Sequence, residues 1–297
     1  MFRIVFRFRF RSVFRFLLVL PGILLGGAAG AQQPLAVPPL TAKSWLLLDV
    51  SANQLIASQS AHDRVEPASL TKLMTAYVVF EALHEKKLAM DHEVTVSSRA
   101  WKTSGSKMFI EPQKKVTVDE LLHGMIIQSG NDASVALAED LAGSEEAFAE
   151  RMNAASKRLG LADSNFVNSS GLPDARHYSS AYDLALIAGA LIREYPEYYP
   201  LYSIKEYRYN SITQANRNRL LWLDPNVDGL KTGHTDAAGY CLVASAKRGD
   251  RRMLVVVMGA PSTTSVTTQM VAMDMVVFSS TRSQMTLSCS RNSITRR

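Results

Sequence analysis

The run from Leu70 to Leu83 constrains the fold most, because it predicts a helix without a polar face. One apolar stripe at helical spacing consists of Leu70, Leu73, Met74, Tyr77 and Val78. At about 100° per residue, the opposite side is formed by Ala76, Val79, Phe80 and Leu83, together with Ser69 and Lys72. We therefore expect this helix to be buried, with a lysine among its apolar neighbours.

Ser69 and Lys72 stand three residues apart, so the amine of Lys72 lies one helical turn beyond the hydroxyl of Ser69. A lysine on a helix is usually a solvated charge, but the face around Lys72 is otherwise hydrophobic. Burial disfavours the ammonium form and lowers the pKa of a lysine. A neutral Lys72 can take the proton of a serine nucleophile, and the pair is a candidate catalytic dyad.

Neither the spacing of Ser69 and Lys72 nor any other short motif in this sequence is specific on its own. The S-x-x-K spacing recurs at 104–107, and S-x-N occurs at 51–53 and 290–292 as well as at 129–131. The information lies in an ordered set: Ser69 and Lys72, then Ser129 and Asn131 between two helices, then the Lys-Thr-Gly triplet at 231–233 on a strand.

The composition fits a globular protein and argues against a nucleic-acid binder. The chain has 297 residues, 47% of them hydrophobic, and a formal net charge of +6. Residues 1–31 contribute +5 and residues 263–297 contribute +3, so the body between them carries −2. This balance gives no support to a basic nucleic-acid surface. We see no metal-ligand spacing, expect no cofactor, and expect Cys241 to be a buried free thiol.

Residues 1–31 have the pattern of an export signal: an Arg-rich start, an apolar run, and Ala29-Gly30-Ala31 before Gln32. The apolar run is short for a membrane span, and an uncleaved anchor is the alternative. We expect the mature chain to begin at Gln32 and to act in the periplasm or on the exterior of the cell envelope, with association with the inner membrane left open.

The element pattern predicts an α/β fold of the α+β type. Strands are expected at 44–50, 55–58, 93–96, 205–212, 229–232, 240–246 and 253–258, and helices from 69 to about 87, at 117–126, 131–141 and 144–159, and from 180 to just before Pro196. The segment 97–115 is expected to be a loop. The two ends of the chain, 32–87 and 205–262, should build one antiparallel sheet flanked by helices, with an all-helical lobe, 88–204, inserted between them.

Six stretches resemble the signatures of the serine penicillin-recognising enzymes, and closely those of the low-molecular-mass D-alanyl-D-alanine carboxypeptidases. They are Glu66–Lys72, Ser129–Ala133, Ser170–Pro173, His177–Ser179, Asn216–Trp222 and Asp228–Thr235. The resemblance covers roughly residues 40–262 and is specific, because six separate stretches agree in order. It implies a β-lactamase-like fold and a penicillin-binding domain over residues 32–262.

The resemblance also implies a role for each matching residue. Ser69 attacks the peptide bond between the two terminal D-alanines of a peptidoglycan stem peptide, Lys72 is the general base, and Ser129 passes the proton to the leaving nitrogen. The substrate is bound by Asn131, Lys231, Thr232, Gly233 and His234: Asn131 holds the peptide, Lys231 and Thr232 hold the terminal carboxylate, and the backbone N–H groups of Ser69 and His234 form an oxyanion hole. A β-lactam antibiotic should acylate Ser69.

The chain departs from the family pattern after about Ser262. The family has a second, β-rich domain, an amphipathic C-terminal membrane anchor and a basic residue near the substrate carboxylate, but we find no Lys or Arg at 263–269 and no clear anchor. Of the 36 residues from Ser262 to Arg297, 15 are Ser or Thr. We expect 263–297 to be an atypical, poorly ordered tail, a truncated or out-of-frame replacement of the native end.

Three other functions stay open. A β-lactamase on the same fold needs a further base, and the stretch 165–182 offers Asp174 but no glutamate. A DD-endopeptidase would cut cross-links instead of terminal D-alanine. A folded but inactive wall-binding protein is the non-enzymatic alternative.

Overall fold

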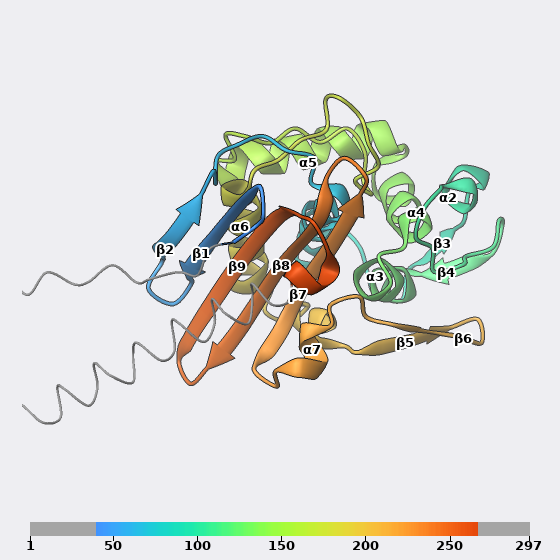
Figure 1. Cartoon of the computed structure of the whole chain (residues 1–297). Coiled ribbons are helices and arrows are strands. Elements are labelled where there is room, and N and C mark those ends of the chain that lie inside the picture. Colours follow the sequence, from blue (N-terminus) through green and yellow to red (C-terminus); the bar gives the residue numbers. More distant parts are fainter. Residues whose placement is uncertain (1–39, 267–297) are drawn as a thin grey trace, which may run out of the picture. The chain divides into compact units, whose positions relative to one another are not determined.

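A five-stranded antiparallel sheet forms one side of the fold in the computed structural model, which describes residues 40–266 (Figure 1). The strand order is β2-β1-β9-β8-β7. The strands are β1 (Ser44–Asp49), β2 (Gln54–Gln59), β7 (Val227–Thr235), β8 (Gly239–Arg248) and β9 (Arg251–Ala260). Because β1 pairs with β9, with Leu46 opposite Val256, the sheet is built from both ends of the described chain, as predicted.

The central strands are buried on both faces of the sheet. On the inner face, Leu46, Val243, Leu254 and Val256 belong to the main core, which they share with the helices. On the outer face, Trp45, Leu242, Val255 and Val257 form a second apolar cluster with Val266. Continuous apolar runs are typical of strands covered on both sides.

The helix predicted to be buried lies at the centre of the molecule. It consists of one 3₁₀ turn, η1 (Ala68–Thr71), followed by α1 (Lys72–His84). Eleven of the 13 residues of α1 are buried, and the helix contacts α3, α4, α5 and α6. It ends three residues before the predicted Lys87, and Ser69 precedes the α-helix instead of lying within it.

The helical lobe also follows the prediction closely. Its main helices are α3 (Val118–Ile127), α4 (Asn131–Ala142), α5 (Glu145–Leu159) and α6 (Ala181–Glu194). Thr117 and Glu120 form the predicted capping box of α3, and Ser180 caps α6. Gly160 ends α5 in the left-handed conformation. Figure 1 shows α2, α3 and α4 beyond the β7 edge of the sheet.

Two segments differ from the prediction. The segment 97–115, expected to be a loop, contains α2 (Ser98–Lys102), capped by Ser97, and its last residue begins β4 (Lys115–Thr117), which pairs with β3 (Glu93–Thr95). Only one residue of α2 is buried, so no apolar period marks it. The single strand expected at 205–212 is a hairpin of β5 (Glu206–Tyr209) and β6 (Ile212–Ala215), because Asn210 and Ser211 both adopt positive φ in a two-residue turn.

Two short helices, η2 (Tyr199–Ser203) and α7 (Leu220–Leu223), were not predicted. Cys241 is buried and free, as predicted, and Val266 is buried against the outer face of the sheet. Among residues 40–266 there is no helix with the length and hydropathy of a membrane span. The predicted export signal, Cys289 and residues 267–297 of the predicted tail lie outside the described residues, whereas the first residues of that tail, 263–266, are helical.

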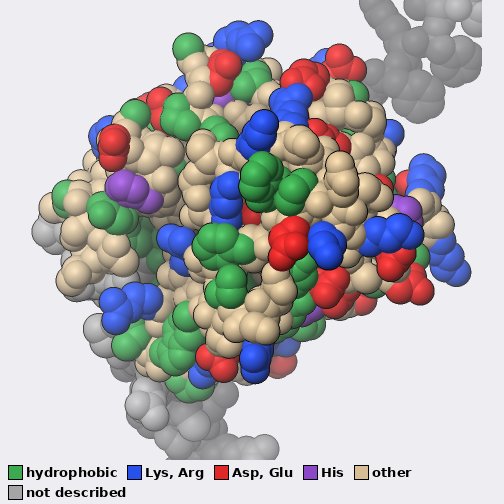
Figure 2. Space-filling model, turned by 90° about the vertical axis from the view of Figure 1, so that its right-hand side faces the viewer, with side chains coloured by type: hydrophobic (Ala, Val, Ile, Leu, Met, Phe, Trp, Pro, Cys, Tyr) green, Lys and Arg blue, Asp and Glu red, His purple; other side chains and the backbone are tan. Residues whose placement is uncertain are grey.

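Charged side chains of both signs are interspersed on the face shown in Figure 2. Among the described residues many charged side chains form pairs, such as Arg99 with Glu145 and Glu146, and Lys115 with Glu93. This mixed surface agrees with the small net charge of the chain body.

Candidate active site

The turn that carries Ser69 is fixed by a loop from a distant part of the chain. Gly171 lies so close to η1 that a Cβ at this position would be 1.8 Å from the backbone oxygen of Ala68 and 2.8 Å from Oγ1 of Thr71. His177 bonds to the same Thr71 hydroxyl through Nε2 at 2.8 Å. The Ser170–Pro173 and His177–Ser179 stretches therefore position the nucleophile turn.

The amine of Lys72 has three neighbours and is 2.9 Å from Oγ of Ser69. It donates to Oδ1 of Asn131 at 2.7 Å and to the backbone oxygen of Ser170 at 2.6 Å. A neutral amine has two N–H groups and one lone pair. With both N–H groups directed at these two acceptors, the lone pair faces the hydroxyl of Ser69.

The surroundings of Lys72 favour this neutral form. The side chain is 1% exposed. Burial lowers the pKa of Lys72 well below its usual value, and the positive charges of Lys231 and then Arg217 lower it further. The sequence predicted the effect of burial on this lysine but not the contribution of the two cations.

Ser129 lies between α3 and α4, as predicted, and Asn131 is the first residue of α4. Asn131 donates to the backbone oxygen of Ser104 at 2.7 Å while its Oδ1 accepts from Lys72. The Oγ of Ser129 is buried and has no hydrogen-bond partner within residues 40–266. Asp132 supports this loop, because its carboxylate accepts hydrogen bonds from the backbone N–H groups of Met108, Phe109 and Ile110.

Strand β7 presents the Lys-Thr-Gly triplet along the edge of the sheet. Lys231 is buried and donates to the backbone oxygen of Thr232, and burial together with Arg217 lowers the pKa of Lys231 to about 7. A Cβ at Gly233 would lie 3.1 Å from the backbone nitrogen of Ser69. His234 is exposed and packs on Tyr240, with ring centroids 4.1 Å apart.

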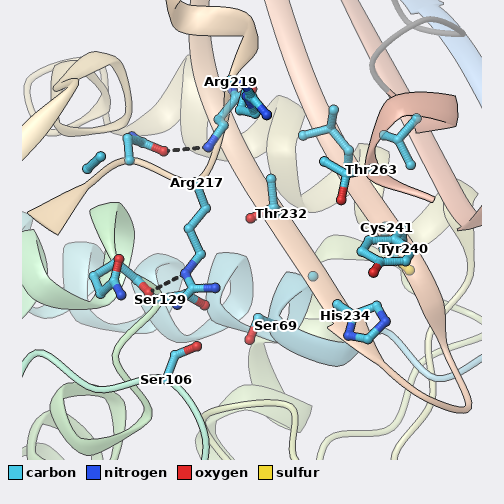
Figure 3. A pocket seen from close by; sticks show the side chains of 17 residues that line it. Ser69, Ser106, Ser129, Arg217, Arg219, Thr232, His234, Tyr240, Cys241 and Thr263 are labelled. Carbon is cyan, nitrogen blue, oxygen red and sulfur yellow. Dashed lines mark hydrogen bonds between the residues drawn. The ribbon is translucent and has the colours of Figure 1, made fainter.

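These elements enclose one cavity of about 490 Å³. Figure 3 shows Ser69, Ser129, Thr232 and His234 around it, with Ser106 below Ser129. Its size is typical of sites for small ligands. The 17 residues that line it include Arg217 and Arg219 but no Asp or Glu. Such a cavity favours an anionic ligand.

Arg217 is a site residue to which the sequence assigned no role. It comes from the loop before α7, extends toward Ser129 in Figure 3, and donates through Nε to the backbone oxygen of Gln128 at 3.0 Å. The sequence has no Lys or Arg at 263–269, but the guanidinium of Arg217 lines the cavity from the loop before α7. The Asn216–Trp222 signature was the sequence feature that could have indicated a role for Arg217.

Glu145 and His177 were also missed as supporting residues. Glu145 is buried at the start of α5 and accepts hydrogen bonds from the backbone N–H and hydroxyl of Ser169. His177 accepts a hydrogen bond from the backbone N–H of Val167 on Nδ1, so its proton is on Nε2, directed at Thr71. Burial lowers the pKa of His177 to about 4, so this ring is neutral near pH 7. No group of three or more His, Cys, Asp or Glu side chains placed to hold a metal occurs in residues 40–266.

Known proteins are similar to this chain in sequence and fold. The chain is 45% identical over 240 residues to the D-alanyl-D-alanine carboxypeptidase DacC of Escherichia coli, an alignment that covers 78% of this chain and 60% of that protein. It is also similar to the crystal structure of penicillin binding protein 6B from Escherichia coli, with a TM-score of 0.78 and 42% identity, covering 84% and 80% of the two chains. Penicillin-Binding Protein D2 from Listeria monocytogenes in its ampicillin-bound form matches with a TM-score of 0.74 and 30% identity, covering 81% of this chain and all of that one.

The chain spans about six tenths of the length of the three carboxypeptidases of Escherichia coli that it matches, namely 60%, 64% and 57%. Residues 29–262 match the peptidase S11 family, described as D-alanyl-D-alanine carboxypeptidase. The match covers most of the chain and includes the site residues from Ser69 to Tyr240. By this match, the chain belongs to the peptidase S11 family of D-alanyl-D-alanine carboxypeptidases.

Proposed function

We propose that this chain is a serine-type D-alanyl-D-alanine carboxypeptidase that releases the terminal D-alanine from peptidoglycan stem peptides outside the cytoplasm. The observation that carries the proposal is the contact of Ser69 with a buried Lys72 whose amine is held by two carbonyl oxygens. This geometry supplies an activated nucleophile beside an acid-free, cationic cavity.

In the acylation step, neutral Lys72 takes the proton of Ser69 as Oγ attacks the carbonyl carbon of the penultimate D-alanine. Such general-base assistance contributes on the order of 10²–10⁴ in rate. The negative oxygen that forms is bound by the backbone N–H groups of Ser69 and His234. Gly233 leaves room for the acyl group here, because a side chain would crowd the Ser69 nitrogen.

The leaving group then departs as D-alanine. Its nitrogen takes a proton that Ser129 passes on from Lys72, and the buried, unpaired Oγ of Ser129 is available for this transfer. The D-alanine carboxylate is bound by the ammonium of Lys231, the hydroxyl of Thr232 and the guanidinium of Arg217. Charge-assisted hydrogen bonds of this kind are stronger than neutral ones. They also select a peptide with a free terminal carboxylate.

Water completes the cycle by attacking the ester carbonyl, with Lys72 again as the base. The same steps leave a β-lactam bound for longer, because the ring-opened acyl group stays attached to Ser69. Asp174, the one acid at 165–182 considered for a β-lactamase mechanism, is occupied on the surface by Arg176. This pairing disfavours fast hydrolysis of the antibiotic.

The experiment uses the chain from Gln32, its Ser69→Ala variant and its Lys72→Met variant, with a labelled penicillin and a D-alanyl-D-alanine peptide. We expect stoichiometric label and D-alanine release for the parent chain, and neither for Ser69→Ala. Lys72→Met should acylate about 10²–10⁴ times more slowly. An unlabelled parent protein would contradict the proposal and favour the inactive wall-binding alternative, and rapid turnover of the drug would indicate a β-lactamase.

A further inference from the structure

The loop that carries the Ser170 oxygen is fixed by the preceding residue, Ser169. The backbone N–H of Ser169 donates to Oε1 of Glu145 at 3.0 Å, and its hydroxyl donates to the same oxygen at 2.7 Å. The backbone oxygen of Ser169 accepts a hydrogen bond of 2.6 Å from the hydroxyl of Thr75, which lies on α1 one helical turn after Lys72. The Ser169 backbone is therefore held between α5 and the helix that begins at Lys72.

Both oxygens of the Glu145 carboxylate are occupied. Oε1 accepts the two hydrogen bonds from Ser169, and Oε2 lies 2.9 Å from the guanidinium of Arg99 on α2. The side chain of Glu145 is only 9% exposed. Glu145 is also the first residue of α5, where the helix dipole favours a negative charge. A buried carboxylate that is paired in this way gives Ser169 a fixed partner.

The fixed position of Ser169 determines where the next acceptor lies. Ser169 is followed directly by Ser170, whose backbone oxygen accepts from the amine of Lys72 at 2.6 Å. A shift of the Ser169 backbone therefore moves this acceptor, whereas Lys72 is held by its own helix. Small misplacements of catalytic groups are costly, since about 1 Å can lower a rate by about 100-fold.

The charge of Glu145 also acts on Lys72. Burial and nearby positive charges lower the pKa of Lys72, whereas nearby carboxylates raise it. The titratable groups that face Lys72 from the elements around it are Lys231 on β7, Arg217 in the loop before α7, Asp132 on α4, Glu145 on α5 and His177 in the loop between α5 and α6. Glu145 therefore limits how far the pKa of Lys72 falls.

We propose that Glu145 is a positioning residue of this reaction, which keeps the Ser170 oxygen on the amine of Lys72. The inference rests on the proposed function, because it assigns Glu145 a task in the same site. Glu145 is not among the residues that line the active-site cavity. It therefore acts on kcat and on the pH dependence of the rate, and not on the binding of the peptide carboxylate.

The test measures kcat, KM and the pH dependence of kcat/KM on a D-alanyl-D-alanine peptide, together with the rate of acylation by labelled penicillin. Glu145→Gln keeps one acceptor oxygen but loses the charge. Its kcat and acylation rate should fall about two- to tenfold at unchanged KM. The acid limb of kcat/KM should move to lower pH, because the pKa of Lys72 falls further without this carboxylate. Glu145→Ala also loses the acceptor, so kcat should fall about 10- to 100-fold.

The matched control is Glu146→Gln. Glu146 follows Glu145 on α5 and pairs with the same Arg99, but its side chain is 68% exposed and the hydrogen bonds from Ser169 go to Glu145. Glu146→Gln should keep the parent kcat and pH profile. Ser169→Ala removes one of the two bonds to Glu145, so it should lower kcat less than Glu145→Ala and add no further loss when combined with it.

Two results would overturn the inference while leaving the carboxypeptidase intact. One is a Glu145→Gln protein, shown to be folded by circular dichroism, that has the parent kcat and an unmoved acid limb. The other is an equal effect of Glu145→Gln and Glu146→Gln, which would assign the change to surface charge. Glu145→Gln decides the question alone where Glu145→Ala does not fold. A parent chain that neither binds penicillin nor releases D-alanine would instead contradict the proposed function itself.

Discussion

The amine of Lys72 donates a hydrogen bond of 2.6 Å to the backbone oxygen of Ser170, a residue 98 positions further along the chain. Ser170 lies in the loop between α5 and α6, and Gly171 follows it directly against the Ser69 turn. In this hydrogen bond the loop contributes a backbone oxygen and no side chain. The orientation of Lys72, the proposed general base, therefore depends on how closely this loop approaches η1, and not on the side chain at position 170.

Gly171→Ala should separate the loop from the catalytic turn. A Cβ at this position would lie 1.8 Å from the Ala68 oxygen, and Gly171 has φ of +84°. The loop must move, and the acceptor for Lys72 moves with it. We expect penicillin acylation to fall by about 100-fold or more, since small misplacements of catalytic groups cost about this much.

The matched control for this substitution is Gly160→Ala. Gly160 has a similar φ of +74°, but no atom lies within 4 Å of the place that its Cβ would take, so the backbone strain is kept and the collision is removed. Gly160→Ala should acylate at the parent rate. Equal acylation rates in the two variants, both shown to be folded by circular dichroism, would contradict the role of the Ser170 contact.

The pH dependence of kcat/KM should be bell-shaped, because Lys72 must be neutral while Lys231 is charged. Burial and the charge of Lys231 lower the pKa of Lys72 well below its usual value, so activity rises as Lys72 loses its proton. Lys231 has a pKa of about 7, and above that pH it loses the charge that we propose binds the substrate carboxylate. Kinetics on the D-alanyl-D-alanine peptide across both sides of this pH would measure both limbs.

Lys231→Arg identifies the alkaline limb, since a guanidinium stays charged throughout this range. The variant should lose the fall in activity above about pH 7 while keeping the acid limb. An unchanged alkaline limb in a folded Lys231→Arg protein would show that another group titrates there.

Arg217→Gln should weaken carboxylate binding and shift the whole profile to higher pH. Arg217 lowers the pKa of both Lys231 and Lys72 by its positive charge, so its removal raises both values. We expect KM for the peptide to rise about tenfold, with both limbs moved toward alkaline pH. Arg217→Lys should restore the pH positions of both limbs more fully than it restores KM. An unchanged pH profile in Arg217→Gln would be incompatible with this electrostatic role.

Sequence reasoning located the parts of the site that lie on regular elements. The buried helix after Ser69, the start of α4 at Asn131 and the strand with Lys231 each have a periodic or capped sequence, and short-range spacing fixes their side chains. Their meeting in space was implied by the family resemblance and not by the spacing itself. The contacts of Lys72 with Ser170 and Asn131 span 98 and 59 residues, so no local pattern encodes them.

Arg217 was missed for a related reason. Its loop has no hydrophobic period, and its path is set by side chain to backbone bonds with distant segments. Asn216 donates to the oxygen of Ile204, and Asn218 donates to the oxygen of Gly229. An arginine in such a loop looks like an ordinary solvated charge. Helices α2 and α7 were missed because they have only five and four residues, too few to show a period.

His177 should make the protein sensitive to acid. Its pKa of about 4 in the folded state is below its ordinary value of 6.5, because burial disfavours the charged ring. As pH falls below 6.5 the unfolded chain takes up a proton that the folded chain does not, so the free energy of unfolding decreases until about pH 4, by about 3 kcal/mol.

His177→Gln should be less stable at neutral pH, because its bond with Val167 is lost, but its melting temperature should fall less on acidification to about pH 4 than that of the parent chain. His62→Gln, at a side chain that is 65% exposed, should follow the parent curve. Parallel curves for His177→Gln and the parent chain would assign the acid sensitivity to other groups.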